Sequence, residues 1–229
     1  MDKDAIKTLK EKGRKNLTEP ETMEILASMG IALPKRLVVK SVEEAMNSAS
    51  GIGYPLVLKV VSADIVHKTE AGGVATGLKD TAELESAWME MLWHIADDVP
   101  GANIEGFIIE EMLPPGAVEV IVGSLKDNQF GPAVMFGMGG IMVEATRDFS
   151  FRLAPVTKEE AMEMVTEIKA YAFLDGSRGK RFDIDGIAEV IFKMSRIISE
   201  FDFIAEIEIN PLFVYQNSVV AADARAVLV

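Results

Sequence analysis

The spacing of apolar residues switches repeatedly between the period of a helix and that of a strand along this chain. Helical spacing predicts helices over residues 2–15, 18–30, 41–49, 80–95 and 184–200, and another that begins at Thr157. Short apolar runs between turn residues predict strands at 35–40, 54–61, 73–78 and 104–113, two long strands within 118–140, one strand at 150–155, and a C-terminal hairpin.

Capping residues support two of these helices. Thr18 precedes Pro20 in the first turn and Glu21 at the capping-box position, and Gly30 follows as a stop signal. Thr157 also has a glutamate at capping-box spacing. Both helices therefore have a defined start.

The order of the elements indicates the fold class. Strands often follow one another directly, and helices occur in both halves, so the sequence predicts an α+β fold with largely antiparallel sheets. A Pro-Pro-Gly break after the strand at 104–113 is the expected boundary between two lobes, residues 1–113 and 114–229.

Composition narrows the classes of function. The chain has 229 residues, which suffice for a large core, no cysteine, and a formal net charge of -13. Such a charge disfavours binding to nucleic acid and to acidic membrane surfaces. No apolar run approaches the roughly 18 residues of a membrane span, and the N-terminal residues contain no apolar core of signal-peptide length. These features predict a cytoplasmic protein.

The C-terminal hairpin brings oxygen-bearing side chains together. If residues 216–217 form a two-residue turn, counting back along both arms pairs Asn210 with Asp223 and Glu208 with Arg225. Carboxylate and amide oxygens placed in this way suit Mg²⁺ bound with a nucleotide. The alternative is an amphipathic edge hairpin with a solvated acidic face and a Glu208–Arg225 ion pair, and a slip of one residue would undo the pairing.

Alternation along the first arm strengthens the metal hypothesis. Glu206, Glu208 and Asn210 point to one side of the strand, and Ile207 and Ile209 point to the other.

Three further segments contain polar residues in apolar surroundings. Lys59 lies inside the run "PLVLKVV", so its ammonium must reach solvent, a carboxylate or a ligand phosphate. The strand end "EEML" (110–113) and Glu119 flank the Pro-Pro break. Arg152 follows a glycine cluster. Its guanidinium and the backbone amides of the glycines can hold phosphate. The alternative is a β-bulge and turn with surface ion pairs.

The loop "SADIVHKTEAGG" contains one of the two histidines. His67 can carry a phosphoryl group on its imidazole, and Gly72 and Gly73 give the loop freedom; the alternative is a polar surface residue. His94, beside Trp93 on a predicted helix, is expected to be structural.

Four segments, in this order along the chain, resemble the β subunit of the ADP-forming acetyl-CoA synthetases, which belong with succinyl-CoA synthetase to the NDP-forming acyl-CoA synthetase superfamily. They are "GYPLVLKVVSADIVHKTEAGGVATGL", "GFIIEEMLPPGAVEVIVG", "FGMGGIMVEATRDFSFRLAP" and "AEIEINPLFV…AADAR". The resemblance covers the chain from about residue 15 onward. It implies an ATP-grasp fold, in which two lobes clasp a nucleotide, and a reaction that converts acyl-CoA, ADP and phosphate to acid, CoA and ATP.

The resemblance also implies roles for residues that bind the nucleotide. Lys59 would bind its phosphates, Glu110 and the backbone near Met112 or Leu113 would meet the adenine, and Glu119 would face the ribose hydroxyls.

The resemblance implies further roles around the transferred phosphoryl group. Asn210 and Asp223 would bind Mg²⁺, Arg152 would lie near the β- and γ-phosphates, and Glu208 would lie nearby and orient the phosphohistidine. His67 matches the histidine that accepts the phosphoryl group within the β subunit.

A partner is implied as well. The chain contains no candidate CoA-binding domain, so a separate CoA-binding α subunit is expected, in an α2β2 or similar heteromer. Other hypotheses stay open, namely an ATP-grasp subunit for another acid such as succinate, malate or an aryl acid, and a nucleotide-sensing module without turnover.

Overall fold

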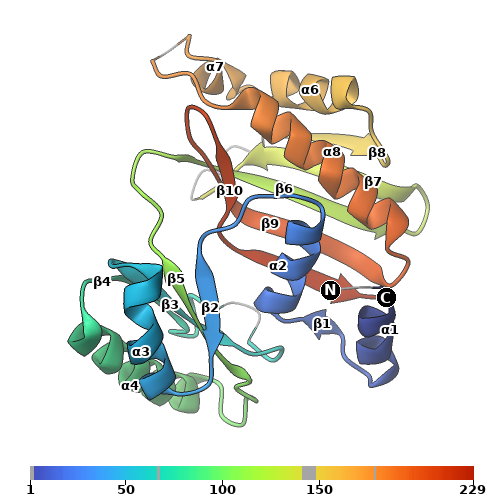
Figure 1. The fold of residues 1–229 in the computed structure, drawn as a ribbon. Helices are drawn as coiled ribbons and strands as arrows, with labels where there is room; N and C mark the ends of the chain where they lie inside the picture. The colour runs from blue at the N-terminus through green and yellow to red at the C-terminus, as the bar shows by residue number, and fades with distance from the viewer. Residues whose placement is uncertain (1–2, 66–67, 141–147, 178) are drawn as a thin grey trace. The chain divides into compact units, whose positions relative to one another are not determined.

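The computed structural model describes residues 3–65, 68–140, 148–177 and 179–229 (Figure 1). It divides into two compact units. The first comprises residues 1–33 and 115–229, and the second comprises residues 34–114. Each unit is α+β, and every pairing between described strands is antiparallel. The predicted fold class is confirmed.

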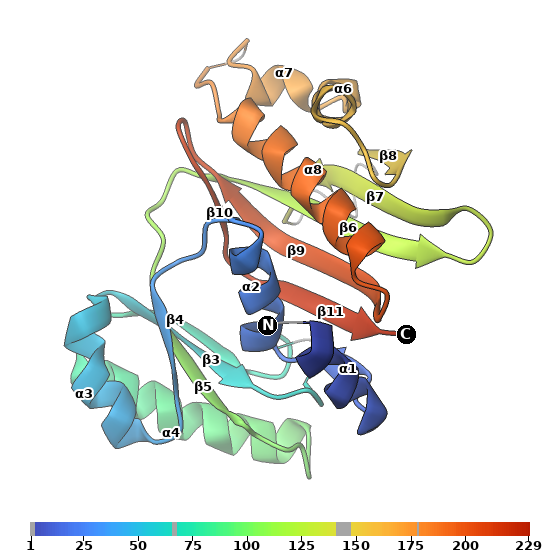
Figure 2. The same cartoon turned by 45° about the vertical axis from the view of Figure 1, so that its right-hand side comes forward.

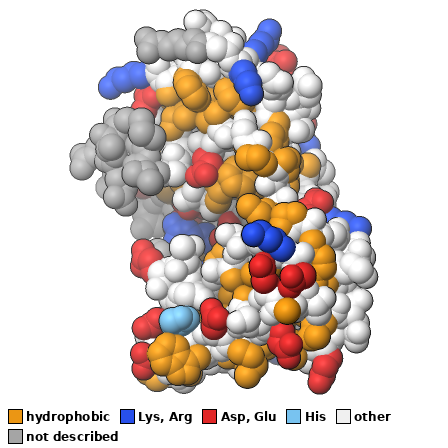
Figure 3. All heavy atoms as spheres, turned by 90° about the vertical axis from the view of Figure 1, so that its left-hand side faces the viewer, with side chains coloured by type: hydrophobic (Ala, Val, Ile, Leu, Met, Phe, Trp, Pro, Cys, Tyr) orange, Lys and Arg blue, Asp and Glu red, His pale blue; other side chains and the backbone are white. Residues whose placement is uncertain are grey.

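The smaller unit is a four-stranded sheet with two helices on one face. The strand order is β2-β5-β3-β4, and the elements are β2 (Arg36–Val39), α3 (Val42–Ile52), β3 (Leu56–Val61), β4 (Val74–Leu78), α4 (Thr81–Asp98) and β5 (Gly106–Glu111). Trp88 of α4 packs on Phe107 of β5, with ring centroids 3.8 Å apart. Acidic side chains are spread among hydrophobic ones where this unit appears, in the lower part of Figure 3, in keeping with the net charge of -13.

The larger unit is built on a second sheet. The strand order is β1-β11-β9-β6-β7-β8, and β10 also pairs with β9. Its elements are α1 (Lys3–Glu11), β1 (Asn16–Leu17), α2 (Glu19–Ser28), β6 (Val118–Asp127), β7 (Gly131–Met138), β8 (Phe149–Leu153), α6 (Lys158–Glu167), α7 (Tyr171–Leu174), α8 (Ile184–Glu200), β9 (Ile204–Val214), β10 (Val219–Ala221) and β11 (Ala224–Leu228). The helices α6 and α8 lie on one side of β6, β7 and β8 (Figure 2).

Strand register sorts the side chains of this sheet onto two faces. Ile207 lies on the face covered by α6 and α8 and is fully buried. The opposite face, called the second face below, carries Glu208, Gly123, Met135 and Phe151 in a single row across β9, β6, β7 and β8. Residues paired directly across antiparallel strands point to the same side.

The N-terminal segment differs from the predicted division into lobes. Residues 1–33 belong with the C-terminal unit, because β1 pairs with β11 and the apolar side of α2 joins the core of the larger unit. The other boundary falls between residues 114 and 115, within the Pro-Pro-Gly break. The first helix ends at Glu11, before the predicted end at residue 15, and two short elements, β1 and α7, were not predicted.

No helix among the described residues is both long enough and apolar enough to cross a lipid bilayer.

Candidate functional site

The C-terminal hairpin has the register that the sequence predicts. A backbone hydrogen bond of 2.8 Å closes the two-residue turn at 216–217, and Arg225 is paired with Glu208 further along. Between these points the Asn210 N–H donates to the Asp223 carbonyl oxygen at 3.0 Å. Asn210 and Asp223 therefore lie directly opposite each other, and the predicted pairing is confirmed.

Carboxylate and amide groups gather on the second face at this hairpin. Arg225 Nη2 donates to Glu206 Oε1 at 2.8 Å and to Glu208 Oε2 at 3.4 Å. Asn210 Nδ2 donates to Glu208 Oε1 at 3.3 Å, and Asp223 Oδ1 accepts a bond of 2.8 Å from the next backbone N–H. The Glu208–Arg225 ion pair of the alternative interpretation is thus present, together with the Asn210–Asp223 pair.

These groups fit a magnesium ion that is bound with a nucleotide. Because Asn210 Nδ2 bonds to Glu208, the amide Oδ1 points away from that carboxylate. The Asp223 carboxylate lies on the neighbouring arm, so both residues present hard oxygen ligands from adjacent positions. Mg²⁺ usually takes one or two protein oxygens and fills its other positions with water and phosphate oxygens.

Glu119 lies on the same second face. It is paired with Phe213 of β9, beyond a register shift that follows Val120. The segment that follows β7 packs against it, since the Gly139 N–H donates to the Glu119 carbonyl at 2.8 Å, and a Cβ atom at Gly140 would lie 2.9 Å from Glu119 Oε2. Glycine at position 140 therefore lets the backbone approach the carboxylate, and glycine at position 139 lets it approach the Glu119 backbone.

The smaller unit contains a buried ion pair. Lys59 of β3 and Glu110 of β5 are 6% and 3% exposed, and Lys59 Nζ lies 2.7 Å from Glu110 Oε1. Neighbouring positions on β3, Leu58 and Val60, face the core with α3 and α4, so Lys59 points to the opposite side of the sheet. Of the three partners that the sequence left open for Lys59, the structure assigns a carboxylate.

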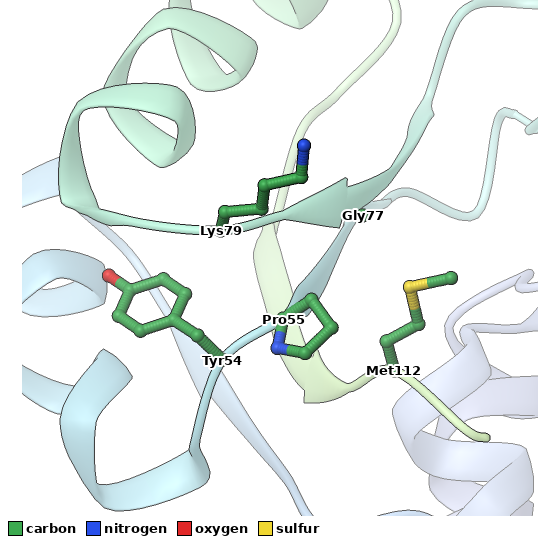
Figure 4. A pocket seen from close by; sticks show the side chains of 5 residues that line it. All are labelled: Tyr54, Pro55, Gly77, Lys79 and Met112. Atoms are coloured by element: carbon green, nitrogen blue, oxygen red, sulfur yellow. The ribbon is translucent and has the colours of Figure 1, made fainter.

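A pocket of about 400 Å³ opens at the end of the same sheet (Figure 4). Its lining consists of Tyr54, Pro55, Gly77, Lys79 and Met112. Tyr54 and Met112 lie on either side of Pro55, and the Lys79 side chain extends away from the proline ring.

Met112, which lines the pocket, belongs to the segment "EEML" that the resemblance connects with the base. Met112 is 42% exposed, and its N–H already donates to the Pro55 carbonyl at 3.0 Å. Leu113 is half-buried. The lining combines apolar side chains with one lysine and one tyrosine, which suits a flat aromatic ring with polar edges. Sequence reasoning missed Tyr54, Pro55 and Lys79, because nothing in their spacing connects them with Met112.

His67 lies outside the described residues, but the segments on both sides of it are described. Asp64 Oδ2 accepts a bond from the Asn103 N–H at 2.9 Å and holds the start of the loop. At its end, the Val60 N–H donates to the Gly73 carbonyl at 2.9 Å.

The glycine pair that ends this loop is explained by close packing. Gly72 has a φ of +65°, and a Cβ atom there would lie 3.0 Å from His94 Cβ. At Gly73 a Cβ atom would lie 2.6 Å from Val60 Cγ1. The sequence predicted that these glycines give the loop freedom. At this end of the loop they instead allow close packing that a larger residue would prevent. His94 is exposed on α4, and the expectation that it is structural stays a prediction.

Arg152 does not join the Glu208 cluster. It is paired with Val134 of β7, which is buried beneath the helices, so Arg152 points to the face opposite Glu208. There its guanidinium binds both carboxylate oxygens of Glu167 on α6, and this hydrogen bonding raises the pKa of Arg152 and lowers that of Glu167. The expectation that Arg152 and Glu208 lie together is wrong, because the strand alternation puts them on different faces. Surface ion pairing, the alternative, is what the structure contains.

A family model described as an ATP-grasp domain matches residues 8–228. The chain belongs to the ATP-grasp family. This ATP-grasp chain is 47% identical to subunit beta of acetate–CoA ligase [ADP-forming] I from Pyrococcus furiosus, over 93% of this chain and 91% of that subunit. It is 42% identical to acetate–CoA ligase [ADP-forming] I from Archaeoglobus fulgidus over 91% of its own length, but it spans only 30% of that longer chain.

Solved structures agree with this assignment. An acetyl-coenzyme A synthetase 1 from Ca. Korarchaeum cryptofilum, in complex with coenzyme A and Ca-AMPCP, superposes with a TM-score of 0.95 at 41% identity and full coverage of both chains. Another structure of that enzyme, with Mg-AMPPCP, has its phosphohistidine segment pointing towards the nucleotide-binding site; its TM-score is 0.85 at 39% identity, with 99% of each chain covered. The predicted ATP-grasp fold is confirmed.

Proposed function

We propose that this ATP-grasp chain is the nucleotide-binding β subunit of an ADP-forming acetyl-CoA synthetase. The observation that carries the proposal is the hairpin that sets Asn210 against Asp223, with Glu208 and Glu119 on the same face of the sheet. The 47% identity to the P. furiosus subunit over nearly its whole length supports the same conclusion.

The second face of the larger sheet would hold the metal and the sugar. Asn210 and Asp223 bind Mg²⁺, which when bound offsets the negative charge of the phosphates. Glu208 is held by Arg225 and Asn210, and this fixed position suits a group that orients an imidazole. Glu119 accepts hydrogen bonds from the ribose hydroxyls.

The smaller unit would bind the base and the phosphates. The Lys59 ammonium, which is paired with Glu110, also donates a hydrogen bond to a phosphate oxygen. This is a second charge-assisted bond. The base occupies the pocket beside Met112. Because the Met112 N–H is committed to Pro55, the backbone of Leu113 supplies the donor to the edge of the base.

His67 would carry the phosphoryl group. In the direction of ATP formation, an oxygen of the ADP β-phosphate attacks the phosphorus held on the His67 imidazole. The P–O bond forms as the P–N bond breaks, and the ring nitrogen keeps the electron pair. No further reactant is needed for this step. The phosphoryl group reaches His67 from a separate CoA-binding α subunit.

Phosphoryl labelling tests the proposal directly. The chain is mixed with its CoA-binding subunit, acetyl-CoA, Mg²⁺ and radiolabelled phosphate, and ADP is omitted. We expect acid-labile, base-stable label on the β chain, which ADP then removes as labelled ATP.

The second histidine offers a matched control. His67→Asn should abolish the label and ADP-dependent turnover, whereas His94→Asn should keep both, because His94 packs against Gly72 and takes no part in the transfer. Turnover of His67→Asn at the wild-type rate would exclude the carrier role.

A further inference from the structure

Arg225 is shared between two carboxylates on the second face of the larger sheet. Strand register places it directly opposite Glu208, whereas Glu206 lies two residues away on β9, opposite Val227. Side chains directly opposed across antiparallel strands have Cβ atoms about 4.5–5.5 Å apart, and diagonal neighbours are about 7–8 Å apart. Register alone therefore predicts that the guanidinium pairs with Glu208.

The bond lengths show the opposite preference. Arg225 Nη2 lies 2.8 Å from Glu206 Oε1 but 3.4 Å from Glu208 Oε2. A charge-assisted N–H···O bond is usually about 2.7–2.9 Å long, so the bond to Glu208 is stretched. The Glu208 side chain is also less exposed, at 16% against 38% for Glu206, and an ion pair is stronger where less water surrounds it. The guanidinium thus lies closer to the carboxylate that register and hydration favour less.

Glu208 keeps room for another hydrogen-bond donor. Among the described residues, the side chains that donate to it are Arg225 at 3.4 Å and Asn210 at 3.3 Å, and both bonds are longer than usual. On the other side of β9 it is paired with Gly123, which has no side chain. A carboxylate has about four lone-pair positions, so it can still accept a short bond from an imidazole N–H. A guanidinium bound to both oxygens of Glu208 would occupy the positions that this bond needs.

We infer that Glu206 is a positioning residue, which draws the Arg225 guanidinium away from Glu208 and so keeps the Glu208 carboxylate available as an acceptor. This inference rests on the proposed function for the role of Glu208, which is to orient the imidazole of the phosphohistidine. Glu206 acts through Arg225 and not by contact with the reactants. The shared positive charge also offsets the repulsion between the two carboxylates.

Substitution of Glu206 tests the inference in the complete enzyme. The chain and its CoA-binding subunit are assayed in the direction of ATP formation, with acetyl-CoA, phosphate, Mg²⁺ and varied ADP. In Glu206→Gln the neutral amide attracts the guanidinium less than a carboxylate does, so Arg225 moves onto Glu208. We expect kcat to fall about tenfold or more, because this is the factor that a hydrogen bond to a charged group contributes. KM for ADP should stay within about twofold of the wild-type value.

A second substitution separates positioning from a structural role. Combining Glu206→Gln with Arg225→Gln removes the competing guanidinium, so kcat should return to within about threefold of the wild-type value. An exposed ion pair that served stability alone would give no such rescue. The matched control is Glu200→Gln on α8, since Glu200 pairs with Arg196 at 2.6 Å and the two side chains are 39% and 50% exposed. This control should keep the wild-type kcat.

The inference and the proposed function fail in different ways. A wild-type enzyme that makes no ATP would refute the proposed function, but a crystal structure of the Glu206→Gln chain would still show where the guanidinium lies. We expect Arg225 Nη2 within about 3.0 Å of a Glu208 oxygen in that structure. An Arg225 side chain turned to solvent there would overturn the inference. So would a Glu206→Gln enzyme with the wild-type kcat, or a double variant as slow as Glu206→Gln alone.

Discussion

Removing one charge of the buried Lys59–Glu110 pair should destabilise the smaller unit far more than removing both. Both side chains are almost fully buried, at 6% and 3% exposure, and their charged atoms are 2.7 Å apart. Glu110→Gln leaves the ammonium in a site built for an ion pair, and Lys59→Met leaves the carboxylate there. In the double variant neither member of this pair carries a charge that must be desolvated.

The magnitudes are large enough to measure. At 2.7 Å and an effective dielectric constant of about 20, the Coulomb attraction is about 6 kcal/mol, most of which offsets the cost of desolvating the two ions. Breaking a buried pair from one side costs about 3–5 kcal/mol, whereas replacing both partners by neutral groups of similar size is close to neutral. The double variant should therefore be less destabilised than the sum of the single variants by at least about 3 kcal/mol.

Tryptophan fluorescence gives an assay specific to the smaller unit. The chain has two tryptophans, and both lie on α4 of that unit. Trp88 is 5% exposed and stacks near Phe107, on the strand that carries Glu110. Urea titrations of the wild type, both single variants and the double variant complete the thermodynamic cycle. Additive losses in the free energy of unfolding would refute the argument, because they would mean that the two groups are stabilised independently.

Other predictions concern the larger unit and the loop end. Asp223→Ala should leave the fold intact and weaken the binding of Mg-nucleotide, measured by calorimetry, about tenfold or more. Unchanged affinity would show that Asp223 is not a metal ligand. Arg152→Gln should leave the affinity for nucleotide unchanged. A tenfold loss of that affinity would show that Arg152 does bind the phosphates. Because Arg152 lowers the pKa of Glu167 below its ordinary 4.5, their pairing stabilises the wild type above that pH and is lost as the pH falls below it; urea titrations at pH 7 and pH 4 should therefore differ less in Arg152→Gln. Gly72→Ala should cost about 1–2 kcal/mol, and more than Gly101→Ala, whose φ is also positive but whose Cβ would meet open space; equal losses in unfolding experiments would show that packing at Gly72 is unimportant.

The hairpin register was predictable because a single local feature determines it. Once residues 216–217 form a two-residue turn, every pair along both arms follows by counting, up to Arg225 and Glu208. Asn210 and Asp223 keep this pairing even though the second arm is divided between β10 and β11. Local turn chemistry and alternation suffice for such a site, and no knowledge of the rest of the fold is needed.

Arg152 illustrates what a local pattern cannot determine. Alternation along β8 shows that Arg152 and Phe151 face opposite ways, but it does not say which of the two faces the helices cover. That depends on α6, which returns to the sheet later in the chain and binds the guanidinium through Glu167. The same applies to residues 1–33, whose strand β1 finds its partner in β11 at the far end of the sequence.

The glycines that end the loop after β3 show how packing can imitate a functional signal. In the sequence, Gly72 and Gly73 follow a histidine and indicate mobility. In the structure, Gly72 has a left-handed φ beneath His94, and Gly73 leaves room for Val60, so this end of the loop is tied to β3 and α4. A carrier histidine benefits from such fixed ends, because a segment that is tied down on both sides visits fewer wrong positions than a free one.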